Sequence, residues 1–240
     1  MEIQLANVTK VFGRKRALSH LHLDFGPGQI VAILGVNGAG KSTLLQIMAG
    51  LLVPTSGSVY YDDVLLQRRK IDLRKRFHLL PDFPFFFAGA TVISHIAMML
   101  ELYGRDTPET RVRVTGLLER LDLLPMITSP LGTLSRGQMY KAALAGMIAV
   151  QPELWMLDEP FASGMDPRGL KVFREEAIRA AAGGATVLFS SQIIAAVEQV
   201  ATHVLVLHEA EVKAFAPIDQ LKREMAGNAG LDAIFSNLTE

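Results

Sequence analysis

The chain has 240 residues, half of them hydrophobic and 20% charged, and its 24 basic residues balance 24 acidic ones. This composition excludes a disordered chain, which would be polar and highly charged. The even charge balance argues against a nucleic-acid partner, because such proteins usually carry a basic excess. The absence of cysteine excludes disulfides, thiolate zinc sites and cysteine nucleophiles.

The sequence contains no apolar stretch of the roughly 20 residues that a membrane-spanning helix needs. Its N-terminus lacks the basic start and apolar run of a signal peptide. We therefore expect a cytoplasmic protein when the chain is isolated, which leaves room for attachment to a membrane through a partner.

The first 61 residues are predicted to form short strands and one helix. Apolar residues at 3–8 and 18–25 predict strands on either side of a turn at residues 12–15. The run 28–35 predicts a buried strand, residues 41–50 an amphipathic helix that Gly50 ends, and residues 57–61 another strand.

The remainder alternates between helices and strands. Residues 91–150 are helical by pattern, with breaks at 104–108, Pro125 and 130–132. Strands are predicted at 154–157, 186–189 and 203–207, and helices at about 168–182 and 193–200. This alternation predicts an α/β fold with a mostly parallel sheet. We expect one domain over residues 1–240, with a helical lobe at about 83–150 and a tail at about 226–240.

The segment "GVNGAGKS" fits the phosphate-binding P-loop pattern between a strand and a helix. Its glycines allow backbone N–H groups to surround a phosphate, and the helix start attracts the same anion. A chance glycine turn of this pattern is expected in roughly one chain of this length in a hundred. The predicted phosphate-site residues are Gly35, Asn37, Gly38, Gly40, Lys41, Ser42 and Thr43.

The segment "LWMLDEP" is an apolar strand that delivers two carboxylates at its end, where α/β sheets place ligand chemistry. We expect Asp158 to hold Mg²⁺ through water, together with the Ser42 hydroxyl, and Glu159 to polarise an attacking water. Read alone, the segment favours an ordinary strand that ends in solvated acids, and it is the P-loop upstream that favours the metal and catalytic roles.

A third segment, "LSRGQ", places an N-cap serine, Ser135, at the start of a helical run, with Gly137 easing the turn. The P-loop, LSRGQ, the strand ending in Asp-Glu, and "SGMDP" at 163–167 follow one another in this order. In order and spacing this set resembles the ATP-binding subunits of ABC transporters, over about residues 1–225.

The resemblance implies a P-loop NTPase core with an N-terminal antiparallel β lobe, and it implies ATP and Mg²⁺ as ligands. It also implies a head-to-tail dimer with a second copy or a related subunit. In that dimer Ser135, Gly137 and Gln138 face the ATP on the other chain's Lys41, which suits a helix start. Phe12 falls where family members stack an aromatic ring on adenine, although read alone it fits a core position equally well.

Within the family, "SGMDP" and "LLPDFPFFF" are most similar to ABC-2-type exporters, whose membrane-spanning permease is a separate polypeptide. This implies a peripheral location on the cytoplasmic face of a membrane. The aromatic run at 83–87 is interpreted either as local core packing or as an apolar patch that docks onto the permease.

Three positions depart from the family pattern. Arg136 replaces a glycine of the LSxGQ segment, and Asp82 stands where a glutamine is common. A carboxylate at 82 can bind Mg²⁺ or a water but cannot donate a hydrogen bond at neutral pH. Gln192, in "ATVLFSSQ", replaces a histidine that contacts the γ-phosphate. Glutamine keeps the hydrogen-bond donor and loses the titrating group.

Two functions are compatible with these residues. The first is an ATPase that powers a separate membrane-spanning transport subunit by ATP-driven closure of a dimer. The resemblance to ABC-2-type exporters implies that this subunit is an exporter. The second is a soluble ABC-type regulator or nucleotide switch with slow or no turnover. Lys41, Asp158 and Glu159 favour the first, whereas Asp82 and Gln192 keep the second open.

Overall fold

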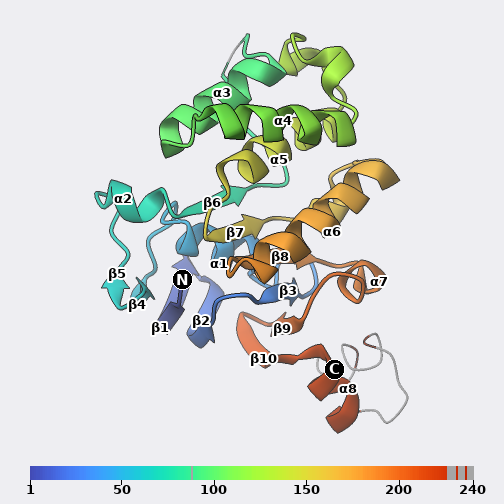
Figure 1. Ribbon diagram of the computed structural model, residues 1–240. Coiled ribbons are helices and arrows are strands. Elements are labelled where there is room, and N and C mark those ends of the chain that lie inside the picture. The colour runs from blue at the N-terminus through green and yellow to red at the C-terminus, as the bar shows by residue number, and fades with distance from the viewer. Residues whose placement is uncertain (88, 226–230, 232–235, 237–240) are drawn as a thin grey trace.

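The computed structural model describes residues 1–87, 89–225, 231 and 236, which form two β-sheets and a lobe of helices (Figure 1). The first sheet is antiparallel, in the order β2-β1-β4-β5. Its strands are β1 (Ile3–Phe12), β2 (Lys15–Phe25), β4 (Ser56–Tyr61) and β5 (Val64–Leu65). The turn predicted at 12–15 is confirmed by the pairing of Phe12 with Lys15.

The strands β1 and β2 are longer than the short strands that the sequence suggests. Irregular pairing in β1 between Leu5 and Val8 moves the alternation by one residue, and both side chains remain buried. Such bulges let one strand continue while its apolar face keeps pointing at the core. A strict two-residue period is therefore broken in the sequence although the strand is not.

The second sheet has the order β10-β9-β3-β8-β7-β6 and is parallel except for the antiparallel pair β9 and β10. Its strands β3, β7 and β8 are buried at every position, because the sheet is covered on both faces. The parallel strands all present their carboxyl ends at one edge. The bounds are β3 (Ile30–Leu34), β6 (Phe77–Leu80), β7 (Leu154–Leu157), β8 (Thr186–Ser191), β9 (His203–His208) and β10 (Glu211–Pro217).

The helices are α1 (Lys41–Met48), α2 (Ile71–Arg74), α3 (Val92–Tyr103), α4 (Pro108–Arg120), α5 (Arg136–Val150), α6 (Pro167–Ala182), α7 (Ile194–Val197) and α8 (Ile218–Met225). Single 3₁₀ turns lie at Leu124–Met126, Leu131–Thr133 and Pro160–Ala162. The helix predicted at 193–200 is shorter in the structure, where it is α7. The strands β6 and β10 have no counterpart in the sequence-based prediction. Both lie at an edge of their sheet and are only partly buried, so their apolar pattern is weak.

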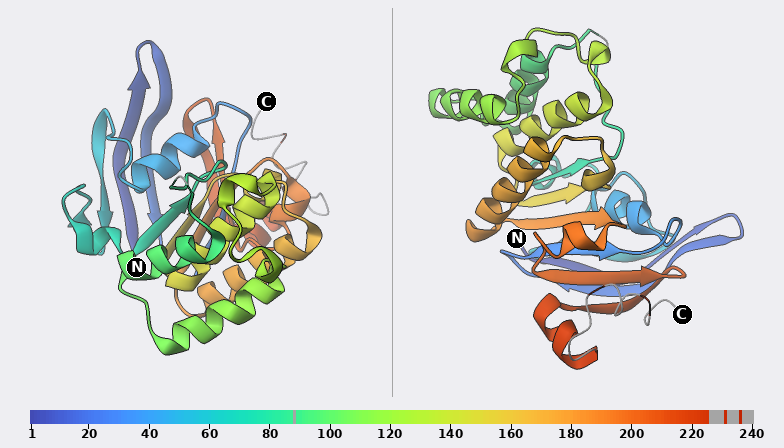
Figure 2. Two further views of the ribbon diagram at one scale, coloured as in Figure 1. Left: turned by 90° about the horizontal axis from the view of Figure 1, so that it is seen from above. Right: turned by 90° about the vertical axis from the view of Figure 1, so that its right-hand side faces the viewer.

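Helices α3, α4 and α5 lie between β6 and β7 in the chain and stand beyond one end of the sheets, as Figure 2 shows. The helix α5 is buried continuously from Tyr140 to Val150, which explains why this stretch is apolar on all sides. The fold class predicted from the sequence is thus confirmed, including the antiparallel N-terminal sheet and the inserted helices.

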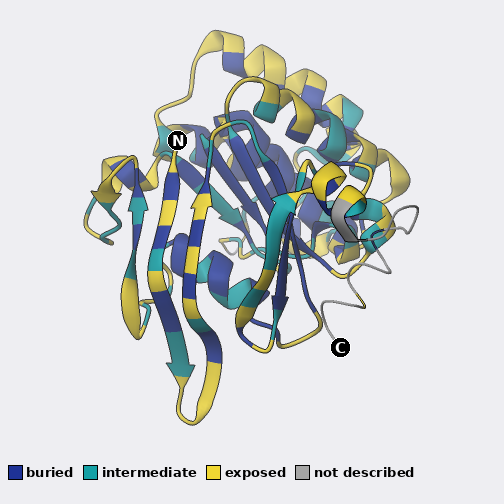
Figure 3. Cartoon of the chain, turned by 90° about the horizontal axis from the view of Figure 1, so that it is seen from below, coloured by how far each residue is buried: buried dark blue, intermediate teal, exposed yellow. Residues whose placement is uncertain are grey.

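Two clusters of apolar side chains form the core on opposite faces of the parallel sheet. One joins the sheet to α3, α5 and α6, and the other fills the space between the parallel sheet, α1 and the antiparallel sheet. Figure 3 shows the central strands as uniformly buried and the helices of the lobe as exposed along one side. The carboxyl edge of the parallel sheet is therefore held rigidly between two packed layers.

Within the described part of the chain, no helix has the length and apolar character needed to cross a membrane. The tail predicted at about 226–240 lies outside the described residues, apart from Leu231 and Ser236.

Candidate functional site

The P-loop connects the end of β3 to the start of α1. Gly40 precedes the helix with φ of 111°, and a Cβ atom there would lie 2.4 Å from the Ala17 carbonyl oxygen. A Cβ on Gly35 would lie 2.5 Å from the Leu207 carbonyl oxygen. Only glycine fits both positions, so the loop backbone is pressed against β2 and β9 and its N–H groups are free to line an anion site.

Lys41, the first residue of α1, is only 6% exposed. Its Nζ donates a hydrogen bond to the Gly35 carbonyl oxygen at 2.8 Å and lies 3.3 Å from Glu159 Oε1. The P-loop cation and the predicted water-polarising acid, 118 residues apart by number (159 − 41), are therefore adjacent in space.

The two carboxylates follow β7 and are held by the neighbouring strand β8. Asp158 Oδ1 accepts a 2.6 Å hydrogen bond from the Ser190 hydroxyl, whose oxygen in turn accepts one from the Glu159 backbone N–H at 2.8 Å. Glu159 has φ of 49°, a conformation that a non-glycine residue adopts at a cost. Ser190 is a residue whose role sequence reasoning missed, although its position at the end of an apolar strand was a signal.

Gln192 lies just beyond β8 and reaches into the same place. Its Nε2 donates hydrogen bonds to Asn37 Oδ1 at 2.9 Å and to Glu159 Oε1 at 3.2 Å. The side chain thus points at the P-loop and at the acid rather than capping α7. These two contacts use both N–H bonds of the glutamine amide.

Asn37, Lys41, Asp158 and Glu159 line one cavity of about 440 Å³ at the carboxyl edge of the parallel sheet. Gln192 contacts two of these residues but does not itself line the cavity, and neither does Gly35. Phe12 is 47% exposed at its rim, so it is not a core residue. Lys15, in the turn predicted at 12–15 and the first residue of β2, adds a second cation that sequence reasoning overlooked. The lining residues are Phe12, Lys15, Ala17, Asn37, Gly38, Gly40, Lys41, Ser42, Thr43, Asp82, Asp158 and Glu159.

Ser42, Asp82 and Asp158, the predicted Mg²⁺ residues, all line this cavity. Among the described residues no three His, Cys, Asp or Glu side chains cluster closely enough to form a metal cage. This donor set suits Mg²⁺, which is usually bound by one or two carboxylates together with substrate phosphates and waters. Asp158 is pre-oriented for such a role by its bond from Ser190.

The LSRGQ residues lie beside the P-loop cavity of their own chain and do not line it. Ser135 caps α5: its Oγ accepts from the Gln138 N–H, and Gln138 Oε1 accepts from the Ser135 N–H at 2.9 Å, which confirms the predicted N-cap. Gly137 packs on the Gly164 carbonyl, where a Cβ would lie 2.1 Å from the oxygen. None of Ser135, Gly137 and Gln138 lines the P-loop cavity of its own chain.

The segment 163–167 is tied to α5 by a buried cation. Lys141 Nζ donates to Asp166 Oδ2 at 2.9 Å, and Asp166 Oδ1 caps α6 by accepting from the Gly169 N–H at 2.7 Å. Partial burial opposes ionisation of Asp166, but these two hydrogen bonds outweigh it and lower the pKa of its carboxyl. The LSRGQ and SGMDP segments therefore form one unit at the start of α5.

The ABC transporter family profile matches residues 18–162, more than half of the chain. The chain belongs to the ABC transporter family. It is 27% identical to the ABC-type transporter ATP-binding protein EcsA of Bacillus subtilis, over 99% of this chain and 96% of EcsA. It is 28% identical to the bacitracin transport ATP-binding protein BcrA of Bacillus licheniformis, over 92% of this chain and 71% of BcrA. A solved ATP-binding subunit of an ABC transporter superimposes with a TM-score of 0.93 at 26% identity, covering 100% of both chains.

In this ABC ATPase, two of the three departures from the family pattern contact each other. Arg136 Nη2 donates to Asp82 Oδ1 at 2.5 Å, and its guanidinium lies 4.3 Å from the centre of the Phe83 ring. One turn further along α5, the buried Tyr140 hydroxyl has no hydrogen-bond partner. Burial raises the pKa of Tyr140 well above its ordinary value, and the carboxylates of Asp158, Asp82 and Glu159 raise it further.

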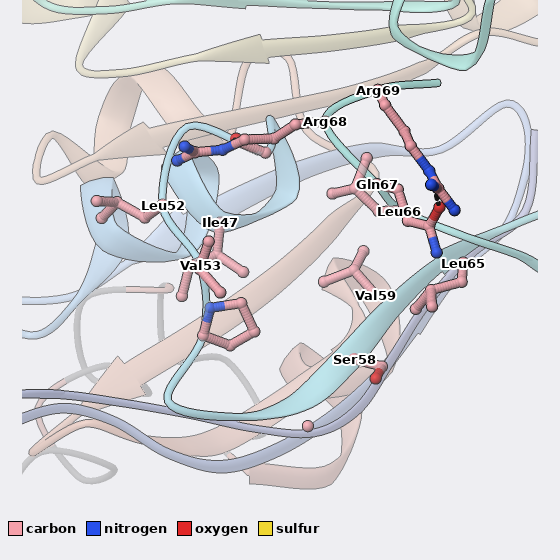
Figure 4. A pocket seen from close by; sticks show the side chains of 13 residues that line it. Ile47, Leu52, Val53, Ser58, Val59, Leu65, Leu66, Gln67, Arg68 and Arg69 are labelled. Carbon is pink, nitrogen blue, oxygen red and sulfur yellow. Dashed lines mark hydrogen bonds between the residues drawn. The ribbon is translucent and has the colours of Figure 1, made fainter. Parts of the chain in front are cut away.

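Figure 4 shows a second cavity of the ABC ATPase, about 550 Å³ in volume, between the end of α1 and strands β4 and β5. Apolar side chains such as Ile47 and Val59 line it, and Arg68 turns away to donate to the Gly50 and Leu51 carbonyl oxygens at the end of α1. No carboxylate is among its lining residues. It offers no acid–base chemistry, in contrast to the P-loop cavity.

Proposed function

We propose that this chain binds Mg-ATP in the P-loop cavity and hydrolyses it to power a separate membrane-spanning transport subunit. The observation that carries the proposal is the meeting of Lys41, Asp158 and Glu159 in one cavity at the carboxyl edge of the parallel sheet. The relatives named above are transport proteins, which favours this function over the regulatory nucleotide switch.

The chain's own residues supply charge, orientation and a base. Lys41 places a buried ammonium at the phosphate site, and the loop N–H groups and the α1 start add donors. Bound Mg²⁺ supplies charge neutralisation on the phosphates. Glu159 is the group we assign to accept the proton of the attacking water. The phosphates of bound ATP would compete with Glu159 for the Lys41 ammonium, because both are negatively charged.

Two chains are proposed to close head to tail around two ATP molecules. Ser135 is exposed, and the α5 start that it caps lies outside the P-loop cavity of its own chain. A helix start with free N–H groups is an anion site, and the family resemblance supports the other chain's γ-phosphate as the anion that binds there. The link from Lys141 to Asp166 would then let the SGMDP segment follow α5 toward the second subunit.

The membrane partner, proposed to be the permease of an exporter, is expected to dock on a groove of about 850 Å³ where α2, β6 and α3 meet. Ile71 and Leu102 line it and are more than half exposed, which is costly for a surface without a partner. Arg74 and Glu101 add charges of opposite sign to the apolar lining. An amphipathic cytoplasmic helix of the permease has the matching chemistry. This attachment would hold the chain at the cytoplasmic face of a membrane.

The aromatic run at 83–87 is interpreted from the sequence either as core packing or as an apolar docking patch, and its members differ in this respect. Phe86 packs against the core and meets the His95 ring edge-on at 5.0 Å, whereas Phe83, Phe85 and Phe87 are 62%, 92% and 70% exposed. The exposed members stay candidates for a second contact with the permease.

The double replacement of Ile71 and Leu102 by glutamate is expected to move the chain from washed membranes of its host to the soluble fraction. Two charges in an apolar groove oppose burial under a partner helix. Replacing Val112 by glutamate is the control, because this valine is even more exposed than Ile71 and Leu102 but lies on α4, outside the groove. Quantitative immunoblots of both fractions measure the effect. Equal membrane recovery of the groove variant and the wild type would contradict the docking site.

The second contact is tested in the same way, by replacing Phe85 and Phe87 with serine.

Replacing Gln192 by histidine is expected to raise kcat about tenfold, since a charge-assisted bond to phosphate is stronger than a neutral one by about 1 to 2 kcal/mol. The kcat of this variant should then depend on pH near 6 to 7, where histidine titrates. Glutamine does not titrate, so residue 192 gives the wild-type kcat no such dependence. Replacement by alanine should lower kcat, because Asn37 and Glu159 both lose their contact with the amide. Gln199, exposed beyond α7, gives the control substitution Gln199→His. Identical steady-state kcat values for all four proteins would show that position 192 does no chemistry.

A further inference from the structure

The ion pair between Asp82 and Arg136 joins the ATP cavity to the start of α5. Asp82 lies in the loop after β6 and lines the P-loop cavity, whereas Arg136 is the first residue of α5 and does not. Their side chains meet at 2.5 Å although 54 residues separate them. The pair is therefore a direct contact between a residue that faces this chain's own nucleotide and the helix start assigned to the second nucleotide.

The carboxylate of Asp82 is held by a contact that can be broken. The side chains of Asp82 and Arg136 are 31% and 44% exposed, and ion pairs at such positions contribute little net stability. The guanidinium keeps a second support on the Phe83 ring when the carboxylate leaves. A divalent cation beside Asp82 would offer this carboxylate a stronger partner than the arginine does.

The neighbouring residues of α5 face the same charges. Tyr140, one turn beyond Arg136, has its buried hydroxyl unpartnered and feels the carboxylates of Asp82, Asp158 and Glu159. Arg136 acts in the opposite sense on this hydroxyl. Arg136 thus supplies positive charge where the flank of α5 meets the acidic side of the ATP cavity.

We propose that Arg136 is a positioning residue that holds Asp82 until Mg²⁺ arrives with ATP, at which point Asp82 turns from the guanidinium to a water of the ion. The exchange makes the charge of the cavity depend on Mg²⁺ and frees the first residue of α5 in the same step. This inference rests on the proposed ATPase function and adds to it a means of distinguishing Mg-ATP from metal-free ATP.

Removing the arginine charge has opposite consequences for the two forms of the nucleotide. Without Arg136, Asp82 faces the cavity unpaired, so metal-free ATP meets an additional negative charge and binds more weakly. Mg-ATP no longer competes with the guanidinium for Asp82 and binds more tightly. Since an exposed ion pair is worth at most about one factor of five in an equilibrium constant, each change should be about two- to five-fold.

The test measures the affinity of the purified chain for a non-hydrolysable ATP analogue, AMP-PNP, by calorimetry with Mg²⁺ and with EDTA. The variants are Arg136→Gln, Asp82→Asn, the double variant and Arg136→Lys. Arg136→Gln should increase the ratio of the two affinities about tenfold, and Arg136→Lys, which keeps the charge, should change it little. In the Asp82→Asn background Arg136→Gln should have no effect, because the contact is already lost. Arg111→Gln is the control, since Arg111 forms a similar exposed pair with Asp106 on the lobe.

Changes of both affinities in the same direction, or an effect of Arg136→Gln that persists beside Asp82→Asn, would overturn the role of Arg136. Wild-type protein that binds Mg-AMP-PNP while Arg136→Gln leaves the ratio unchanged would overturn this inference alone. Failure of the wild-type chain to bind either form would overturn the proposed function as well.

Discussion

Replacement of Lys41 by alanine is expected to abolish tight ATP binding, with a loss of affinity of at least about 100-fold. Hydrogen bonds to charged groups contribute about 1.5 to 3 kcal/mol each, and Lys41 is placed to make two of them, to the β- and γ-phosphates. The lysine is buried and its ammonium is fixed by the Gly35 carbonyl oxygen, whereas Lys15, the other lysine of the cavity, is exposed and does not have this fixed position. The measurement is calorimetric titration with Mg-AMP-PNP.

Lys15 provides the matched control for this prediction. It lines the same cavity, but it is the exposed first residue of β2. Lys15→Ala should weaken binding only a few-fold, because an exposed ammonium is screened by solvent. Lys41→Ala also leaves Glu159 without its cation at 3.3 Å, so thermal unfolding of both variants should be recorded to show that each is folded. Wild-type affinity in a folded Lys41→Ala protein would refute the P-loop assignment.

Replacement of Glu159 by glutamine is expected to lower kcat by at least about 100-fold, since general bases contribute roughly 10²- to 10⁴-fold. ATP binding should survive. Glutamine keeps the shape of the side chain and an acceptor oxygen for Lys41 and Gln192, and the Ser190 contact to the backbone N–H of residue 159 is unchanged. The variant should then accumulate with ATP bound, which in the proposed mechanism is the closed head-to-tail dimer.

Size-exclusion chromatography in Mg-ATP measures this accumulation, and the Glu159→Gln variant should elute at twice the monomer mass. Glu153→Gln is the control: this acid precedes the other end of β7 and pairs with Arg76, so it should leave both kcat and mass unaltered. A Glu159→Gln protein that stays monomeric at saturating ATP would argue against the sandwich dimer. A variant with wild-type kcat would remove Glu159 from the catalytic role.

The sequence by itself determined the features that depend on local pattern. A P-loop needs glycines at fixed offsets between a strand and a helix, and a buried strand must be apolar until it reaches its edge. Both rules hold over a few residues, so "GVNGAGKS" and "LWMLDEP" could be located without a structure. The capping of α5 by Ser135 is local in the same sense. The alternation of strands and helices likewise determined the fold class.

Contacts between distant segments were decided only by the tertiary structure. Ser190 holds Asp158 because β8 is the neighbour of β7 in the sheet, and strand order is not recorded in either strand's composition. Gln192 reaches Asn37 across 155 residues for the same reason, since β8 also pairs with β3.

The departures at Asp82 and Arg136 seemed independent in the sequence, whereas the packing of α5 beside the loop after β6 makes them one ion pair. The aromatic run at 83–87 also needed the structure, because five consecutive apolar residues outside a regular strand carry no period that separates buried from exposed. Contacts of this kind depend on how whole helices and strands pack against one another, and this packing sets the geometry of the site.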